Sequence, residues 1–313
     1  FFRLIEKADV LVENFRPGVM ERLGLGFDKL KEINPQLVYC AISGFGQDGP
    51  LWDSPAYDQI IQGLSGSMSV TGTDDSGPLR VGFPMSDTIG GITAALGITA
   101  SLSQPKREAV FIDVSMLEST MATMGWIISN YLSAGIDPQR MGNENFTSAP
   151  SGAFQTGSGL LNIAANKQEQ YEILCGLLER KDLVNHPDFI SRELRKQHRE
   201  KLKQELEKEL QQNSAAYWSK QLNQAGVPAG EVLSVPQALE LQQIRERGFL
   251  EKFEEVPGLE KPVQLVRTGI QLNGKPLSVQ RPPPQLGEDT HAILKDCGYN
   301  DDEIANFHQE KVI

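Results

Sequence analysis

The first 140 residues alternate between short apolar runs and helical patterns, and this alternation constrains the fold more than any other feature of the sequence. The apolar runs predict strands at Val10–Val12, Leu37–Ser43 and Ala109–Val114. The helical patterns are Val19–Arg22, Phe27–Ile33, Tyr57–Leu64, Asp87–Leu102 and Ser115–Leu132. Nearly continuous apolar strands between helices are typical of a parallel sheet that is covered on both faces. The sequence therefore predicts an α/β fold with a Rossmann-like parallel sheet.

The chain after residue 150 has a different pattern, which predicts a smaller α+β domain. Gly152–Ala165 reads as a hairpin, and residues 168–255 are mostly helical. Within them, opposite charges recur four residues apart over Arg192–Leu210, which predicts a solvated helix face. Strand-like sequence resumes at Val263, and the chain ends in two helical patterns, Thr290–Cys297 and Asp301–Glu310. We therefore expect a small domain that is inserted into the larger one.

Charge and composition disfavour several classes of function. Lys and Arg total 30 against 41 Asp and Glu, and the net charge of −11 argues against a nucleic-acid partner. No apolar run reaches the roughly 18 residues of a membrane span, so we expect no membrane partner. The 3 cysteines and 4 histidines are widely spaced, which disfavours a disulfide framework and a metal site. Because the start of the chain lacks a signal-peptide pattern, we expect a cytoplasmic protein.

Asp87 is the first candidate for a catalytic side chain. A helical pattern follows Pro84, so Ser86 or Asp87 is expected to cap that helix, and a plain capping aspartate is one interpretation. The other is a nucleophile, because a helix N-terminus favours a carboxylate that attacks an activated acyl group. Gly90 and Gly91 would then let a substrate approach the backbone. Neighbouring N–H groups would hold the oxyanion.

A second candidate region follows the strand at Val10–Val12. Asn14, Arg16 and Arg22 come after the end of this strand, and ligands of α/β proteins bind beyond the carboxyl ends of strands. These side chains suit a phosphate or an adenine, and a turn with surface arginines is the alternative. The sequence has no GxGxxG fingerprint, which disfavours a dinucleotide dehydrogenase.

Tyr57 and Asp58 begin a further helical pattern. Taken alone, Tyr57 is expected to pack in the core, and Asp58 is expected to interact with the dipole of its own helix. The sequence has no GxSxG motif, so Ser/His/Asp catalysis has no support.

Several segments in order resemble the family III CoA-transferases (the CaiB/BaiF family), the group that includes formyl-CoA transferase and carnitine CoA-transferase. The resemblance spans nearly the whole chain and is carried by Ala8–Pro50, Ala56-Tyr57-Asp58 with Leu64-Ser65-Gly66, Phe111–Met116 and Leu286–Ile304. It implies an enzyme that moves CoA from an acyl-CoA donor to a small carboxylic acid acceptor. Acyl-CoA would be a substrate, and no cofactor would be tightly bound.

The same resemblance implies roles for individual residues. Asp87 matches the catalytic aspartate of the family, which forms an aspartyl anhydride and then an aspartyl-CoA thioester. Tyr57 matches a tyrosine that supports this aspartate. Asn14, Phe15 and Arg22 match positions that line the CoA site.

The resemblance also implies an architecture. Residues 1–147 would form a large CoA-binding domain, 148–257 the small domain, and 258–313 a return to the large domain. Two subunits would form an interlocked homodimer. Members of the family begin with a strand and a helix that precede Phe1, so we expect part of the CoA pocket to be missing from this chain.

Two alternatives stay open. α-Methylacyl-CoA racemases share the fold and carry a histidine at the position of Tyr57. A racemase needs two acid/base groups across the α-carbon, and a tyrosine is a poor base near neutral pH. The second alternative is a non-catalytic CoA-binding homologue. Scrambling at the α-carbon without an acceptor acid would favour the first, and tight CoA binding without acyl exchange would favour the second.

Overall fold

The computed structural model describes residues 1–313 and divides into two compact units. The first unit comprises Phe1–Gly152 and Ser191–Gln197, and the second comprises Ala153–Ile190 and His198–Ile313. The expected boundaries at residues 147 and 257, and the return of the last segment to the large domain, stay predictions.

The first unit is built on a parallel sheet of three strands. The strands are β1 (Val10–Glu13), β2 (Val38–Ser43) and β3 (Val110–Ser115), in the order β1-β2-β3. Both neighbouring pairs are parallel, with Val38 of β2 opposite Val10 on one side and Val110 on the other. This confirms the predicted α/β fold and its parallel sheet.

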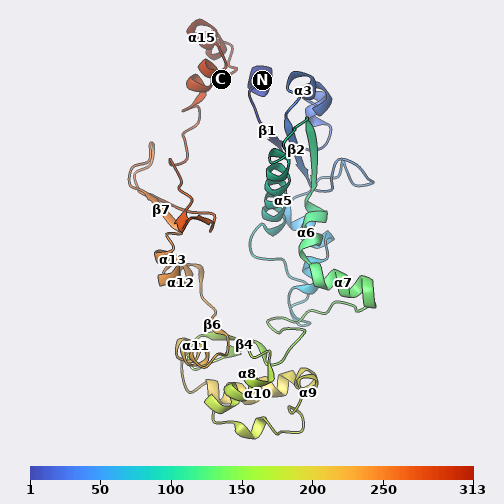
Figure 1. Ribbon diagram of the computed structural model, residues 1–313, viewed down its shortest axis with the longest axis vertical. Coiled ribbons are helices and arrows are strands. Elements are labelled where there is room, and N and C mark those ends of the chain that lie inside the picture. The colour runs from blue at the N-terminus through green and yellow to red at the C-terminus, as the bar shows by residue number, and fades with distance from the viewer. The chain divides into compact units, whose positions relative to one another are not determined.

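Helices cover both faces of this sheet because β2 is apolar on both sides. Side chains alternate between the two faces of a strand, and Leu37, Tyr39 and Ala41 pack with Leu30 in one cluster. Cys40, on the opposite face, packs with Val114 and with Ala94 of the long helix α5 (Met85–Leu102). Figure 1 shows α5 lying along the strands. A continuous apolar run is therefore what a central strand between two layers requires.

The remaining helices of the first unit include, close to their expected positions, those predicted at Val19–Arg22, Phe27–Ile33 and Tyr57–Leu64. They are α1 (Phe2–Ile5), α2 (Val19–Arg22), α3 (Phe27–Ile33), α4 (Asp58–Leu64), the 3-10 turn η1 (Ser67–Val70), α6 (Met116–Thr123), α7 (Gly125–Ala134) and α9 (Arg192–Gln197). The single helix expected over 115–132 is interrupted at Met124, which makes α6 and α7 separate helices. Gly125 follows the break, and glycine disfavours a continuous helix.

The second unit has its own sheet and core. Its three-stranded sheet has the order β4 (Ser151–Gln155), β5 (Leu160–Ala164) and β6 (Ala229–Glu231), and β5 and β6 are antiparallel. The hairpin expected at Gly152–Ala165 corresponds to β4 and β5. The core cluster draws on strands and on three helices, which are α8 (Gln168–Leu177), α10 (Arg199–Leu210) and α11 (Ala215–Gln224).

Short elements make up the rest of the second unit. They are the 3-10 turn η2 (Lys181–Leu183), the helices α12 (Val235–Leu239), α13 (Gln242–Glu246), α14 (Thr290–Asp296) and α15 (Asp301–Gln309), and the strands β7 (Leu250–Phe253), β8 (Val263–Val266), β9 (Gln271–Leu272) and β10 (Lys275–Pro276). β7 pairs with β8, and β9 with β10, in antiparallel ladders.

The charged run Arg192–Leu210 does form a solvated helix face, since most of its charged residues are exposed or partly exposed, but leucines within it form a buried face that the charge pattern did not predict. The run contains two helices, α9 and α10, with His198 between them. Every fourth residue of α10 is apolar and buried, so Leu206 is 0% exposed within the core of the second unit. Arg195 of α9 is also buried, and its Nε donates a hydrogen bond to the Ala149 carbonyl at 3.0 Å.

No helix combines the length and the apolar character that crossing a membrane requires. No group of three or more His, Cys, Asp or Glu side chains is placed to hold a metal ion. All three cysteines are free thiols, and Cys40 and Cys175 are buried.

Candidate active site

Asp87 lies in the first turn of α5, at the end of the helix that faces the carboxyl edge of the sheet. The expectation that Ser86 or Asp87 caps the helix was wrong, because α5 begins at Met85 and the residue in the capping position is Pro84. Asp87 is therefore the third residue of the helix. A carboxylate at this position still lies close to the positive end of the helix dipole.

Asp58, the first residue of α4, accepts hydrogen bonds from backbone N–H groups at the start of α5. Its Oδ1 accepts a hydrogen bond from the Ser86 N–H at 2.7 Å and a longer one from the Asp87 N–H at 3.4 Å. Asp58 lies in the first turn of its own helix, as expected, and it also caps a different helix, 28 residues along the chain. Sequence spacing gave no signal of this tertiary contact.

Gln62 of α4 holds both Asp58 and the segment that leads into α5. Its side chain is 0% exposed, and its Nε2 donates to Oδ2 of Asp58 at 2.7 Å. The same Nε2 lies 3.3 Å from the Phe83 carbonyl, and Oε1 accepts from the Val81 N–H at 2.8 Å. The segment that leads to Asp87 is therefore held in place by the buried side-chain amide of Gln62.

The carboxylate of Asp87 takes part in no hydrogen bond or ion pair of the structure, and the residue is exposed. Although the residue is exposed overall, its carboxyl group is partly buried, and this partial burial is the first cause that raises the pKa of Asp87 above its ordinary value of 3.8; the negative charge of Asp58 is the second. Weaker solvation of the ionised form makes a carboxylate more basic and more nucleophilic. Chemically, the group is a free carboxylate at a helix start.

The N–H groups in the first turn of α5 are already engaged, which bears on the expected oxyanion donors near Asp87. Asp58 accepts those of Ser86 and Asp87. The Met85 N–H donates to the Phe83 carbonyl at 2.8 Å, and the Thr88 N–H donates to the Pro84 carbonyl at 3.1 Å. All four donors of the first turn therefore have acceptors already, so donors for an oxyanion must come from elsewhere.

The two glycines that follow Asp87 differ in their surroundings. Gly90 is buried, and a Cβ on it would lie 3.2 Å from Cγ of Met116 and 3.8 Å from Cγ2 of Ile42. Gly90 thus lets α5 approach its neighbours closely, rather than admitting a substrate as we had expected. A Cβ on Gly91 would meet nothing within 4 Å, so only Gly91 leaves open space beside Asp87's helix.

Tyr57 directly precedes Asp58 and is the N-cap residue of α4. Its side chain is 80% exposed, so the expectation that it packs in the core was wrong. Because Asp58 bonds to the backbone of Ser86 and Asp87, the start of α4 and the start of α5 are held together. The Tyr57 phenol is thus presented to solvent close to the end of α5 that carries Asp87.

The turn after β1 is ordered by two hydrogen bonds. Oε2 of Glu13 accepts from the Phe15 N–H at 2.6 Å, and Nδ2 of Asn14 donates to the Ile42 carbonyl at 2.6 Å. Burial raises the pKa of Glu13 above 4.5, and the charge of Glu21 adds to the shift. The Phe15 ring is left 53% exposed, as is required of an aromatic surface that meets a ligand.

Two arginines follow the same turn without an ion pair. Arg16 and Arg22 are both exposed, and neither takes part in a salt bridge of the structure. Gly18, between them, has a φ of +79°, which glycine adopts most readily. Nη1 of Arg22 folds back to within 3.1 Å of the position of a Cβ on Gly18. Two unpaired guanidinium groups suit an anionic ligand such as a phosphate.

Contacts through Ile42 link this turn to the start of α5. Ile42 lies near the carboxyl end of β2, accepts the hydrogen bond from Asn14, and lies beside Gly90, one turn after Asp87. The sequence-predicted groups Asn14 and Asp87 therefore lie at the same edge of the parallel sheet. This edge is where ligands of α/β proteins bind.

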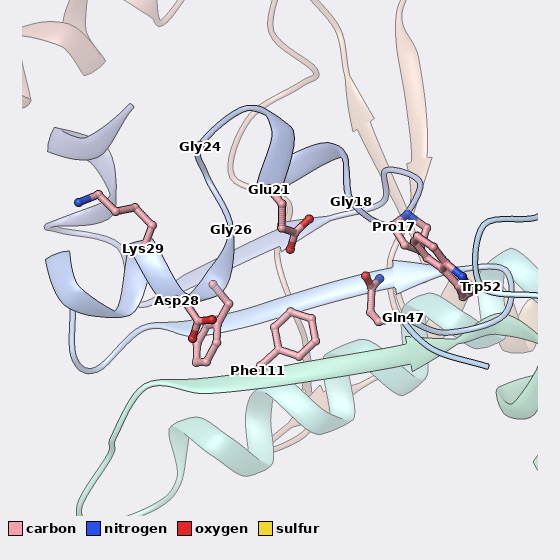
Figure 2. A pocket seen from close by; sticks show the side chains of 11 residues that line it. Pro17, Gly18, Glu21, Gly24, Gly26, Asp28, Lys29, Gln47, Trp52 and Phe111 are labelled. Carbon is pink, nitrogen blue, oxygen red and sulfur yellow. The ribbon is translucent and has the colours of Figure 1, made fainter. Parts of the chain in front are cut away.

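A separate cavity of about 850 Å³ lies beside the turn between α2 and α3. Its lining includes both aromatic and acidic side chains, and Figure 2 shows Glu21, Gln47 and Phe111 around it. The full lining is Pro17, Gly18, Glu21, Gly24, Gly26, Phe27, Asp28, Lys29, Gln47, Trp52 and Phe111. None of the five site residues that the sequence predicted lines it, and none of our expectations had included it.

Comparison with known proteins identifies the family. The family model CoA-transferase family III matches residues 1–290. An acetyl-CoA:oxalate CoA-transferase of Acetobacter aceti is 36% identical, over 95% of this chain and 75% of its own length. A succinate–glutarate CoA-transferase of Agrobacterium fabrum is 32% identical, over 93% and 73%.

A solved structure agrees with this assignment. The crystal structure of a CaiB/BaiF family protein from Brucella suis superposes with a TM-score of 0.83 at 31% sequence identity, covering 95% of this chain and 77% of that one. The match includes the parallel-sheet unit and supports the α/β fold class. The chain therefore belongs to CoA-transferase family III and is an enzyme of the CoA-transferase class.

Proposed function

We propose that this enzyme transfers CoA from an acyl-CoA to a carboxylic acid, with Asp87 as the covalent nucleophile. The observation that supports this most is that the two carboxylates at the start of α5 have different roles. Asp58 caps the helix, and the Asp87 carboxylate is left exposed and without a hydrogen bond. A carboxylate that only capped its helix would accept those N–H groups itself.

The first half of the reaction loads the enzyme. An oxygen of the Asp87 carboxylate attacks the thioester carbonyl carbon of the donor, the C–S bond breaks, and CoA leaves as a thiolate. The product on the enzyme is a mixed anhydride. The thiolate then attacks the Asp87 carbonyl carbon of the anhydride, which releases the donor acid as a carboxylate and forms an aspartyl-CoA thioester.

The second half reverses these steps with the acceptor. The acceptor carboxylate attacks the aspartyl thioester carbonyl and displaces the CoA thiolate, which gives a second anhydride. The thiolate attacks the acceptor carbonyl, so that acceptor-CoA leaves and the Asp87 carboxylate is regenerated. One thioester is exchanged for another, and no oxidant or reductant is consumed.

We infer that CoA binds at the turn after β1. The exposed ring of Phe15 suits stacking on the adenine, and the unpaired guanidinium of Arg22 suits a phosphate. Nδ2 of Asn14 is already engaged with the Ile42 carbonyl, so Asn14 would meet CoA through its Oδ1 or shape the turn. Tyr57, exposed beside the start of α5, would support the bound acyl group.

For the acids, we propose small dicarboxylates. The similar proteins named above are an acetyl-CoA:oxalate CoA-transferase and a succinate–glutarate CoA-transferase. One carboxylate of such an acid would react, and the second would lie in a polar part of the site. Acyl-CoA would be a substrate throughout, and no resident cofactor takes part.

We also propose that the chain functions as an interlocked homodimer, with residues 1–147 and 258–313 in the large domain and 148–257 in the small one. Support comes from apolar side chains that face solvent, because Leu96 of α5 is 70% exposed and Leu132 of α7 is 76% exposed. α7 buries no residue at all. Such surfaces mark interaction sites. Sedimentation equilibrium tests the pairing, and a monomer at micromolar concentration would contradict it.

The nucleophile is tested by trapping the acyl-enzyme. The protein is incubated with succinyl-CoA and hydroxylamine, and its peptides are then analysed by mass spectrometry. We expect a hydroxamate at Asp87, and none in Asp87→Asn, which keeps the side-chain size. Asp87→Asn is expected to fold, since the carboxylate makes no hydrogen bond that the variant would lose.

The matched control is Glu169→Gln, which removes a carboxylate from the first turn of α8 in the other unit. We expect this variant to be labelled at Asp87 like the wild type. A wild-type protein that binds CoA in calorimetry but gives no hydroxamate at Asp87 with a panel of acyl-CoA donors would refute the covalent mechanism.

A further inference from the structure

Two acidic side chains meet at the start of α5, and local geometry prevents one of them from capping it. An acidic third residue of a helix commonly folds back to the N–H of the capping residue. The capping residue here is Pro84, which has no N–H group. The carboxylate of Asp87 therefore lacks the local donor that would otherwise hold it against the backbone.

The other carboxylate takes over the helix. Asp58 accepts from the Ser86 N–H at 2.7 Å, and Nε2 of the fully buried Gln62 donates to its second oxygen, also at 2.7 Å. Through the Val81 N–H and the Phe83 carbonyl, Gln62 also holds the segment before the helix. The start of α5 is thus fixed from α4, by contacts that involve no atom of the Asp87 side chain.

We propose that Asp58 is a positioning residue for Asp87, which fixes the start of α5 so that the Asp87 carboxylate stays free to react. The proposal rests on the proposed function of Asp87 as the nucleophile. Asp58 does not touch substrate in this role. It acts through the N–H groups of Ser86 and Asp87, and through the place at which they hold the reacting side chain.

Asp58 also acts on Asp87 through its charge. The elements packed against α5 are α4, α6, β2 and β3. Their titratable residues are Asp58, Glu118, Tyr39, Cys40 and Asp113. Among these, Asp58 is the one whose charge raises the pKa of Asp87, in addition to the larger effect of burial. Removing the charge should therefore lower the pKa of Asp87 without returning it fully to 3.8.

Three variants separate the geometric role from the charge. Asp58→Ala removes both the cap and the charge. Asp58→Asn keeps an oxygen that can accept from the Ser86 N–H and removes only the charge, although its amide would face Nε2 of Gln62. Glu169→Gln is the matched control, because it neutralises an acidic residue in the first turn of a helix in the other unit.

The first measurement is hydrogen exchange at the amides of Ser86 and Asp87, which does not depend on activity. We expect Asp58→Ala to speed exchange at these amides by roughly 3- to 30-fold, the range that corresponds to losing an N-cap. Exchange of the β2 amides should be the same in Asp58→Ala as in the wild type. Exchange of the Ser86 and Asp87 amides should be the same in Glu169→Gln as in the wild type. Unchanged exchange at both amides in Asp58→Ala would overturn the proposal.

The second measurement is the rate of acylation by succinyl-CoA as a function of pH. A displaced nucleophile costs on the order of 100-fold in rate, so we expect Asp58→Ala to lose about 10- to 100-fold while its affinity for CoA stays within about twofold. In Asp58→Asn, the acid limb of the profile should move to lower pH. A role in folding alone would lower the active fraction and leave this limb in place, which would refute the proposal.

Failure of the proposed function gives a different result. If the wild type forms no acyl-enzyme, the assignment of Asp87 as the nucleophile is refuted. The exchange rate of the Ser86 amide still shows whether Asp58 caps α5. The pKa of Asp87, measured by carbon-13 NMR of its carboxyl group, then replaces the rate profile. A pKa of Asp87 that is the same in the wild type and in Asp58→Asn would overturn the charge argument, and a lower one in the variant would support it.

Discussion

The adjacent glycines of α5 offer a direct test of how this helix is held against the sheet. Both lie in the interior of the helix, where replacing glycine by alanine gains roughly 0.5–1 kcal/mol of backbone stability. They differ in their surroundings, since a Cβ on Gly90 would lie 3.2 Å from Cγ of Met116 and one on Gly91 would meet nothing within 4 Å. Comparing Gly90→Ala with Gly91→Ala cancels the backbone gain and leaves the cost of that contact.

The magnitude follows from the contact itself. Adding a methyl group to a well-packed site costs about 1–3 kcal/mol. Met116 is nearly buried, at 6% exposure, but the side chain of a methionine adapts more easily than a branched one. We therefore expect the lower end, so that Gly90→Ala is less stable than Gly91→Ala by about 1 kcal/mol, or about fivefold in the unfolding equilibrium.

The assay is native-state hydrogen exchange of the amides of β2. This strand is paired on both sides and largely buried, so its slowest amides exchange through unfolding of the first unit. Gly91→Ala should slow their exchange up to about fivefold relative to the wild type, and Gly90→Ala should not. Equal slowing in both variants would mean that α5 does not approach Met116 closely, and would refute the account of Gly90.

Three further predictions concern other contacts. Leu206→Ala should cost the second unit about 2–5 kcal/mol because Leu206 is fully buried, and its urea midpoint measures this. Ser86→Ala should be neutral or stabilising by up to about 1 kcal/mol, since it removes a buried hydroxyl that has no hydrogen-bond partner; a large loss in thermal melting would contradict this. Lys208 and then Arg180 lower the pKa of Glu205 below 4.5, so the stability they give is present above pH 4.5 and is lost as pH falls through the lowered pKa. Arg180→Ala should therefore weaken the fall in urea midpoint between pH 6 and pH 3, and an unchanged fall would refute it.

The sequence predicted the elements of the first unit because their signals are local. A continuous apolar run such as Leu37–Ser43 is typical of a buried strand, and it forms the central strand β2. The same is true of Val19–Arg22 and Phe27–Ile33, which are helices with the expected bounds. Where the signal was a charge pattern, it predicted only the exposed face of α10, because the leucines that recur within the charged run form a buried face.

The candidate site was predicted only in part, because its decisive contacts join residues that are distant in sequence. From sequence alone, a carboxylate at the start of a helix is compatible with a capping role and with a nucleophilic role, and both interpretations of Asp87 stayed open. The tertiary contact from Asp58 removes the need for a local cap. The hydrogen bond from Asn14 to the Ile42 carbonyl likewise joins two strand ends that spacing cannot relate.

One local signal did bear on the choice between cap and nucleophile. Pro84 directly precedes the helix, and a proline offers no N–H group to which an acidic residue in the first turn can fold back. An aspartate that follows such a proline cannot complete a capping box, so a second acceptor must reach the first turn from elsewhere in the fold. In this protein that acceptor is Asp58, and its own position depends on the buried amide of Gln62. Because Pro84 offers no N–H group, the first turn of α5 requires an acceptor from a distant part of the chain. Asp58 supplies this acceptor, and the carboxylate of Asp87 is left free.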